Sequence, residues 1–210
     1  MVCSVYLVRH GETEWNATRR LQGNSDVQLS AKGREQAAQL AKRLAREKID
    51  GFYSSDMKRA VETAQILAAP HGLAVNQIAG LREMNFGPWE GMTIGELEAD
   101  GSWSLLEWFK NPLDVQVPGG EKLTEVIERC NLAMQQLIAA HEKETIAVVA
   151  HGGSIRAIIC SVLGLRHSEM WRLVLENTGL SRIDFQESGI RLVKMINDFS
   201  HLEGGGQHLS

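Results

Sequence analysis

Cysteine is scarce in this sequence, and the few that occur do not form a recognisable framework. Only three of the 210 residues are cysteine, at Cys3, Cys130 and Cys160, and none forms a Cys-x-x-Cys pair. An odd number of cysteines without that spacing favours reduced structural thiols over a set of disulfides. We therefore expect a cytoplasmic protein.

The sequence also lacks a surplus of positive charge and any long apolar run. Its formal net charge is −4, which argues against a nucleic acid or an anionic membrane as the partner, because both need a basic face. No apolar stretch reaches the roughly 20 residues of a membrane-spanning helix. The first apolar run meets Arg9 and His10 after a few residues, which is unlike a signal peptide. Phosphate recognition, if present, would depend on a few local arginines.

Signals for metals and cofactors are missing as well. The seven histidines include no His-x-x-x-His pair and have no acidic cluster of ligand spacing. There is no Walker loop and no dinucleotide-binding glycine motif. We expect no metal and no cofactor.

What the sequence does contain is an alternation of short apolar runs and helical patterns. Apolar runs predict early strands at 5–8, 51–55 and 145–150, and late strands at 177–185 and 190–196. Helical spacing predicts helices at 30–47, from residue 56, around 126–138 and after His151. This alternation predicts an α/β protein, a three-layer αβα sandwich with a mostly parallel central sheet.

Segment 81–120 breaks this rhythm. It is rich in glycine, proline and aromatic residues, and we interpret it as an aromatic, acidic insertion near the active site, with short helices near 93–110. We expect residues 1–203 to form a single domain and residues 204–210 to form a flexible tail.

Two of the predicted strands end in the same unusual way. His10 and His151 each follow an apolar run and precede a glycine. In an open parallel sheet, ligands bind beyond the carboxyl ends of the strands. Arg59 lies at the same edge, in the first turn of the helix that follows strand 51–55. Arginine side chains and helix N-terminal amides together bind phosphate, so His10, beside Arg9, is placed to attack phosphorus.

Two alternative interpretations of these residues need to be weighed. A single histidine at a strand end is more often a hydrogen-bonded polar residue than a catalyst. Cys3 with Arg9, and Cys160 with Arg166, also match the spacing of cysteine-dependent phosphatases. That chemistry needs a glycine-rich loop whose amides bind phosphate and lower the thiol pKa. A buried strand and an apolar helix follow these cysteines instead, so we reject the cysteine mechanism.

Six segments of the chain resemble the histidine phosphatase superfamily, which has the phosphoglycerate mutase-like fold. They occur in the family's order and cover nearly the whole chain. The segments are LVRHGETEWN (7–16), LQGNSDVQLSAKGREQA (21–37), YSSDMKRAVETA (53–64), LREMNFGPWEG (81–91), VPGGE (117–121) and VVAHGGSIR (148–156).

The resemblance implies catalytic roles for five residues. His10 would be the nucleophile that forms a phosphohistidine, and it must be neutral to do so. Arg9 and Arg59 would bind the phosphoryl oxygens. His151, cationic once phosphate is bound, would stabilise the charge on those oxygens. Glu83 would protonate the leaving oxygen and then deprotonate the attacking water.

The resemblance also implies a set of substrate-binding residues. Asn16 would add a neutral donor to the phosphate, and Gln22 and Gly23 would lie at the mouth of the pocket. Gly152 beside His151, and Asn177 at the start of a late strand, would complete the site.

The implied activity is that of a metal-independent phosphomonoesterase acting on a small phosphate monoester. The segments are closest in style to the broad-specificity and α-ribazole phosphatases, although phosphoserine phosphatases of the same superfamily look similar. The pattern leaves open whether the protein is a monomer or a homodimer.

Two further functions remain as alternatives. A phosphoglycerate mutase must bind a second anionic group, yet between Met84 and Gly120 the only cation is Lys110, against six acidic residues. These are Glu90, Glu96, Glu98, Asp100, Glu107 and Asp114. We expect this acidic segment to disfavour polyanionic substrates. A non-enzymatic phosphate-binding module would be expected to lack His10 or Glu83, and both are present.

Overall fold

The computed structural model describes residues 3–100 and 105–205, and a six-stranded sheet forms the centre of this part of the chain. The strand order is β3-β2-β4-β1-β5-β6. Neighbours among the first four run parallel, whereas β5 is antiparallel to both β1 and β6. The strands are β1 (Cys3–Arg9), β2 (Gly51–Ser54), β3 (Val75–Gln77), β4 (Glu144–Ala150), β5 (Leu180–Phe185) and β6 (Arg191–Asp198). The expected α/β class is confirmed, with β5 making the sheet a mixed one.

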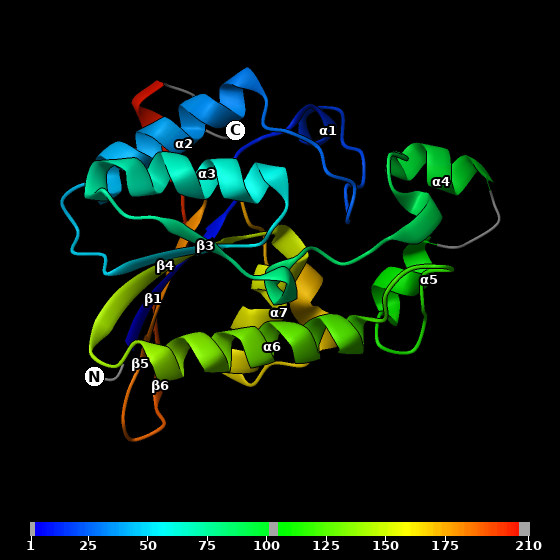
Figure 1. Cartoon of the computed structure of the whole chain (residues 1–210). Helices are drawn as coiled ribbons and strands as arrows, with labels where there is room; N and C mark the ends of the chain where they lie inside the picture. Colours follow the sequence, from blue (N-terminus) through cyan, green and yellow to red (C-terminus); the bar gives the residue numbers. More distant parts are fainter. Residues whose placement is uncertain (1–2, 101–104, 206–210) are drawn as a thin grey trace.

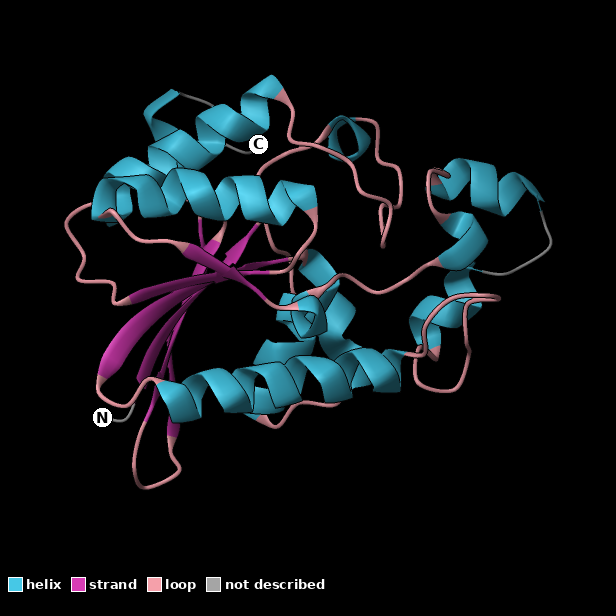
Figure 2. Cartoon of the chain, in the orientation of Figure 1, coloured by secondary structure: helices cyan, strands magenta, loops and turns pink. Residues whose placement is uncertain are grey.

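Helices cover both faces of the sheet (Figure 1). α2 (Ala31–Leu44) and α3 (Lys58–Ala68) lie on one face, and α6 (Leu123–Ala140) and α7 (Gly152–Leu163) lie on the other (Figure 2). β1 shows why the sheet can be covered twice: Val5 and Leu7 join one apolar cluster, and Tyr6 and Val8 join the other. Alternate side chains of a strand point to opposite faces, so the expected three layers follow from the sequence.

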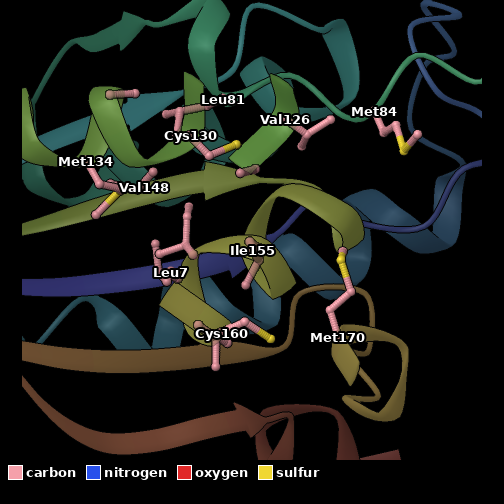
Figure 3. Packing of buried hydrophobic residues seen from close by; sticks show 14 of the residues in the cluster. Leu7, Leu81, Met84, Val126, Cys130, Met134, Val148, Ile155, Cys160 and Met170 are labelled. Atoms are coloured by element: carbon pink, nitrogen blue, oxygen red, sulfur yellow. The ribbon is translucent and has the colours of Figure 1, made fainter. Parts of the chain in front are cut away.

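The larger apolar cluster fills the space between the sheet and helices α6 and α7. Leu7 of β1 and Val148 of β4 pack there against Ile155 and Cys160 of α7 (Figure 3). These four side chains are at most 2% exposed. This packing fixes α7 against the two central strands, and with it the turn that carries His151.

The insertion packs mainly through its aromatic side chains. Its helices are α4 (Ile94–Asp100) and α5 (Leu105–Lys110), as expected near 93–110. Trp108 is 1% exposed, and its ring centroid lies 5.8 Å from that of Phe86 and 5.0 Å from that of Trp171. Trp89 is also buried. These aromatics therefore serve as core, and Trp103 lies outside the described residues.

Shorter helices complete the described chain. They are α1 (Glu14–Ala17) and the 3-10 helices η1 (Ala69–His71), η2 (Ala79–Leu81), η3 (Gly87–Trp89), η4 (His167–Arg172) and η5 (Ser200–Gly205). η5 includes residues 204 and 205 of the predicted tail, and the rest of that tail lies outside the described residues. Within the described residues, no helix combines the length and apolarity needed to cross a membrane.

Most element boundaries shift slightly from those that the sequence predicts. The side chain of Ser30 accepts a hydrogen bond from the amide of Gly33, so α2 begins at the expected cap. β5 begins at Leu180 rather than at 177, because Thr178 adopts a positive φ of 57° and turns the chain before the strand. The three-residue β3 was not predicted, since so short a segment carries almost no pattern.

Candidate active site

The two histidines of the sequence pattern come together because their strands are neighbours. His10 follows β1 and His151 follows β4, and these parallel strands pair Arg9 with Ala150 at their ends. The amide of His10 continues the pairing with a 3.0 Å hydrogen bond to the carbonyl of Ala150. The two imidazole centroids are 5.1 Å apart, and both residues are buried.

The hydrogen bond of His10 determines which ring nitrogen can react. Its Nδ1 lies 2.7 Å from the carbonyl oxygen of Gly11. A carbonyl can only accept, so Nδ1 carries the proton and Nε2 keeps its lone pair. Burial is the main cause that lowers the pKa of His10 well below 6.5, and the positive charges of Arg59 and Arg9 lower it further. The ring is therefore neutral at neutral pH, as a nucleophile must be.

His151 is fixed by two partners from other elements. Its Nδ1 accepts a 3.2 Å hydrogen bond from Nε of Arg59, since a guanidinium can only donate. Its Nε2 then donates to Oγ of Ser55, 2.6 Å away at the end of β2. Burial, followed by the charge of Arg59, lowers the pKa of His151 well below 6.5. Ser55 is a contact that the sequence analysis did not identify.

Two arginines supply fixed positive charge beside the histidines. Arg59, fully buried in the first turn of α3, donates to the carbonyls of Ser25 (2.8 Å) and Gly23 (2.6 Å). Arg9 donates to the carbonyl of Leu175, and its buried Nε has no hydrogen-bond partner among the described residues. Burial lowers the pKa of each to about 10, so both remain charged at neutral pH. Buried cations held by neutral carbonyls favour binding of an anion.

Glu83 reaches the site from the loop after η2 and binds the first turn of α7. Its Oε2 accepts a 2.9 Å hydrogen bond from the amide of Gly153, and its Oε1 accepts one of 2.9 Å from the amide of Met84. These two amides orient the carboxyl group of Glu83 at the start of α7. A Cβ on Gly153 would overlap Oε1 of Glu83, so glycine is required for this approach.

This contact gives a first testable prediction. The substitution Gly153→Ala should displace the Glu83 carboxylate and lower kcat/KM by about 100-fold, the typical effect of misplacing a reacting group by about 1 Å. The flexible end of Glu83 can move aside, so the protein should stay folded. Steady-state kinetics with phosphate monoesters and thermal unfolding measure the two effects.

The matched control is Gly95→Ala in α4. A Cβ there would meet none of the described residues within 4 Å, so this variant should keep its activity. An equal loss of activity in both variants, or none in Gly153→Ala, would contradict the placement of Glu83.

These side chains line a cavity of about 180 Å³. The wall contains eight of the ten predicted site residues: Arg9, His10, Asn16, Gln22, Gly23, Arg59, Glu83 and Gly152. It also contains six that were not predicted: Arg20, Leu21, Phe86, Gly153, Arg156 and Trp171. Arg156 had a weak signal in the sequence, since it lies four residues after Gly152 on the predicted helix. Trp171 lies in a 3-10 helix and had no such signal.

The other two predicted residues, His151 and Asn177, are not among the residues that line this wall. The side-chain amide of Asn177 donates to the carbonyl of His10 at 2.9 Å and lies 3.4 Å from Oδ1 of Asn16. Oδ1 of Asn16 also accepts from the amide of Thr13. Asn177 thus connects the backbone of His10 to Asn16.

The described acidic side chains between residues 84 and 120 do not line the cavity, although two of them bind residues of its wall. The cavity wall contains none of the five described acidic side chains of this segment. The side chain of the sixth, Asp100, is not described. Glu90 instead accepts hydrogen bonds from the amides of Asn24 and Phe86 and from Oγ of Ser25, and Glu96 pairs with Arg20 at 2.9 Å. Glu90 and Glu96 thus bind two residues of the cavity wall, Phe86 and Arg20, without lining the cavity themselves. Its described wall therefore carries four arginines and one carboxylate.

The cysteine thiols are poor candidates for the reaction. Cys3 and Cys160 are fully buried, and burial raises the pKa of both, that of Cys3 to about 11. All three cysteines are free. Within the described residues, no three His, Cys, Asp or Glu side chains gather in a way that could bind a metal ion.

Known proteins resemble this chain over nearly its whole length. The model of the histidine phosphatase superfamily (branch 1) matches residues 5–198. Phosphoglycerate mutase-like protein 4 of Arabidopsis thaliana is 39% identical over 205 residues, which cover 96% of this chain and 88% of that protein.

Two solved structures show the same fold. YhfR of Bacillus stearothermophilus superposes with a TM-score of 0.90 at 32% identity, covering 96% of this chain and all of that one. A mutant phosphoserine phosphatase of Entamoeba histolytica in complex with phosphoserine gives a TM-score of 0.85 at 30% identity, covering 95% of this chain and 99% of that one.

Proposed function

Because this chain belongs to the histidine phosphatase superfamily, we propose that it hydrolyses small phosphate monoesters through a phosphohistidine on His10. One observation carries the proposal. Nδ1 of His10 is held by the carbonyl of Gly11, which leaves Nε2 unprotonated in a cavity with Arg9 and Arg59. A neutral, oriented imidazole between fixed cations suits attack on a phosphate ester.

In the first step, Nε2 of His10 forms a bond to phosphorus while the bond from phosphorus to the ester oxygen breaks. The leaving oxygen takes a proton from the carboxyl group of Glu83, so the product departs as a neutral alcohol. Arg9 and Arg59 bind the phosphoryl oxygens, whose negative charge they stabilise in the transition state. Because the protein already holds these cations in place, little reorganisation is needed during the reaction.

In the second step, a water molecule attacks the phosphohistidine. Glu83, now a carboxylate, takes a proton from that water as the oxygen bonds to phosphorus and the nitrogen–phosphorus bond breaks. Inorganic phosphate leaves, and Nε2 of His10 recovers its lone pair. The hydrogen bond from Gly153 keeps Glu83 oriented in both steps.

His151 and Asn16 act around the same phosphoryl group. A phosphate dianion near the buried imidazole of His151 would raise its pKa again, and a protonated His151 would then stabilise the transferred group. The side-chain amide of Asn16 serves as a neutral donor, oriented through the contacts of its Oδ1. None of these steps requires a metal ion.

A phosphoglycerate mutase is the second candidate function. Four arginines in the cavity wall favour it, since a mutase must hold a second anionic group. However, Arg9 and Arg59 serve the phosphate, and Arg20 is paired with Glu96. Among the described wall residues, this leaves Arg156 as the one further cation without a carboxylate partner. A product held by a single cation leaves readily, so water rather than a second hydroxyl receives the phosphoryl group.

The choice of substrate follows from the size of the cavity. Its 180 Å³ is less than the roughly 300 Å³ at which ordinary ligand pockets begin. A compact ester such as phosphoserine fits this volume best, whereas α-ribazole phosphate would have to extend beyond the cavity. Three free, buried cysteines support a cytoplasmic location.

The experiment that tests this function measures phosphate release. With p-nitrophenyl phosphate and excess chelator, we expect inorganic phosphate in a one-to-one ratio to nitrophenolate. With 2-phosphoglycerate, release of phosphate should outpace formation of 3-phosphoglycerate, as followed by phosphorus NMR. Faster interconversion would identify a mutase. Loss of activity in chelator that a divalent ion restores would refute metal independence.

A further inference from the structure

One half-buried arginine of the cavity, Arg156, has no role in the chemistry proposed above. Arg156 lies on the first turns of α7, four residues after Gly152 and therefore on the same side of the helix. Its side chain lines the cavity together with His10 and Glu83. Unlike Arg20, it forms no ion pair with a carboxylate within the described part of the chain. A desolvated cation without such a partner favours an anionic ligand.

Two contacts fix the guanidinium group of Arg156. Its Nε donates a 2.6 Å hydrogen bond to the carbonyl of Leu173, and its central carbon lies 5.5 Å from the ring centroid of Trp171. Together they set the plane of the group and leave the two terminal nitrogens without protein acceptors among the described residues. Such a pair of donors matches the two oxygens of a carboxylate.

Nη1 of Arg156 lies close to both Glu83 and Arg9. A Cβ built on Gly152 would be 2.9 Å from Nη1 of Arg156, 3.8 Å from Nε of Arg9 and 3.9 Å from Oε2 of Glu83. Both groups thus meet at the same turn of α7. Since Glu83 protonates the leaving oxygen, Arg156 is placed to contact the rest of the leaving group.

The rest of the wall limits what the leaving group can be. Leu21, Phe86 and Trp171 are apolar or aromatic, and the whole cavity measures about 180 Å³. The phosphoryl group occupies the part beside Arg9 and Arg59. What remains admits a few carbon atoms and one small anionic group.

We infer that Arg156 is a specificity residue that selects phosphate monoesters whose leaving group carries a carboxylate. The inference rests on the proposed function, because it places the phosphoryl group at His10. The carboxylate would bind the two terminal nitrogens of Arg156, while the short carbon chain contacts Phe86 and Leu21.

The test compares two substrates that differ only in the carboxylate, phosphoserine and phosphoethanolamine. The wild type should have the higher kcat/KM on phosphoserine. In Arg156→Met, whose side chain can still pack on Trp171, the ratio of the two kcat/KM values should fall by about 10- to 100-fold, as expected for a hydrogen-bonded charge. Arg156→Lys keeps the positive charge but loses the paired N–H donors of the guanidinium. Its ratio should therefore lie between those of the wild type and Arg156→Met.

Arg172→Met is the matched control. Arg172 is 82% exposed on its side chain and pairs with Glu169, so its removal takes one nearby charge away without touching the cavity. This variant should keep the wild-type ratio. An equal fall on both substrates in Arg156→Met, or no preference in the wild type, would overturn the inference.

A second measurement needs no variant, in case Arg156→Met fails to fold. A phosphonate analogue of phosphoserine should inhibit the wild type at least about tenfold more strongly than the same phosphonate without its carboxylate. Equal inhibition would overturn the inference. Hydrolysis of p-nitrophenyl phosphate serves as the separate check, since its absence would refute the proposed function itself.

Discussion

The substitution His10→Ala should lower kcat by about 10⁴-fold or more, because removing a nucleophile eliminates the covalent route rather than weakening it. The fold should survive. The backbone amide of residue 10 keeps its hydrogen bond to the carbonyl of Ala150. Because burial lowers the pKa of His10, the substitution removes a neutral side chain. The alanine variant should still bind inorganic phosphate through Arg9 and Arg59.

The measurement combines kinetics with detection of the intermediate. Wild-type enzyme mixed with substrate and quenched in base should carry phosphate in a form that acid removes, and peptide mapping should locate it at His10. His71→Ala is the control, since η1 lies at the far end of α3 from the site. Among the aromatic rings of the described residues, His71 contacts only that of Phe52. Retained turnover in His10→Ala, or label at another residue, would refute the mechanism.

The substitution Glu83→Gln should separate the two steps of the reaction. Loss of the general acid should slow phosphorylation about 100- to 1,000-fold for alkyl phosphates, whose leaving oxygen needs a proton. For p-nitrophenyl phosphate the leaving oxygen is far less basic, so that step should slow by less than about tenfold. The second step lacks its base with either substrate. The phosphoenzyme should therefore accumulate with the aryl substrate.

Rapid mixing with p-nitrophenyl phosphate provides the measurement. Glu83→Gln should release a burst of nitrophenolate equal to the enzyme concentration, followed by slow turnover. Glu142→Gln, which changes an exposed carboxylate outside the cavity, should show wild-type rates. Similar losses on aryl and alkyl phosphates, with no burst, would show that Glu83 does not transfer the proton.

The sequence predicts the position of the site better than it predicts the charge of the side chains that line it. Two strands that end in His-Gly predict correctly that both histidines meet at one edge of the sheet, because parallel neighbours place their carboxyl ends together. A count of acidic residues between 84 and 120 cannot show where the carboxylates point. Glu90 meets the amides of Asn24 and Phe86, and Glu96 meets Arg20. These are long-range contacts that only the folded chain reveals.

The residues that the sequence analysis missed have the same explanation. Arg156 follows a glycine-rich helix start, but nothing local shows that its guanidinium turns inward onto Trp171. Trp171 itself lies in the irregular η4, where no periodicity marks a buried face. Periodic segments such as α6 and α7 were predictable because one face of each packs on the sheet.

The order of strands also determines when during synthesis the protein can become active. β1 is made first, yet it pairs with β4 and β5, and Cys3 faces Glu144 in the first of these pairs. A growing chain therefore offers β1 no neighbour until its second half has emerged, and pairing over such a distance is slow. A fragment that contains His10, Arg59 and Glu83 but ends before Glu144 lacks both strands that flank β1. The surroundings of His10 can therefore assemble only after β4 has been made.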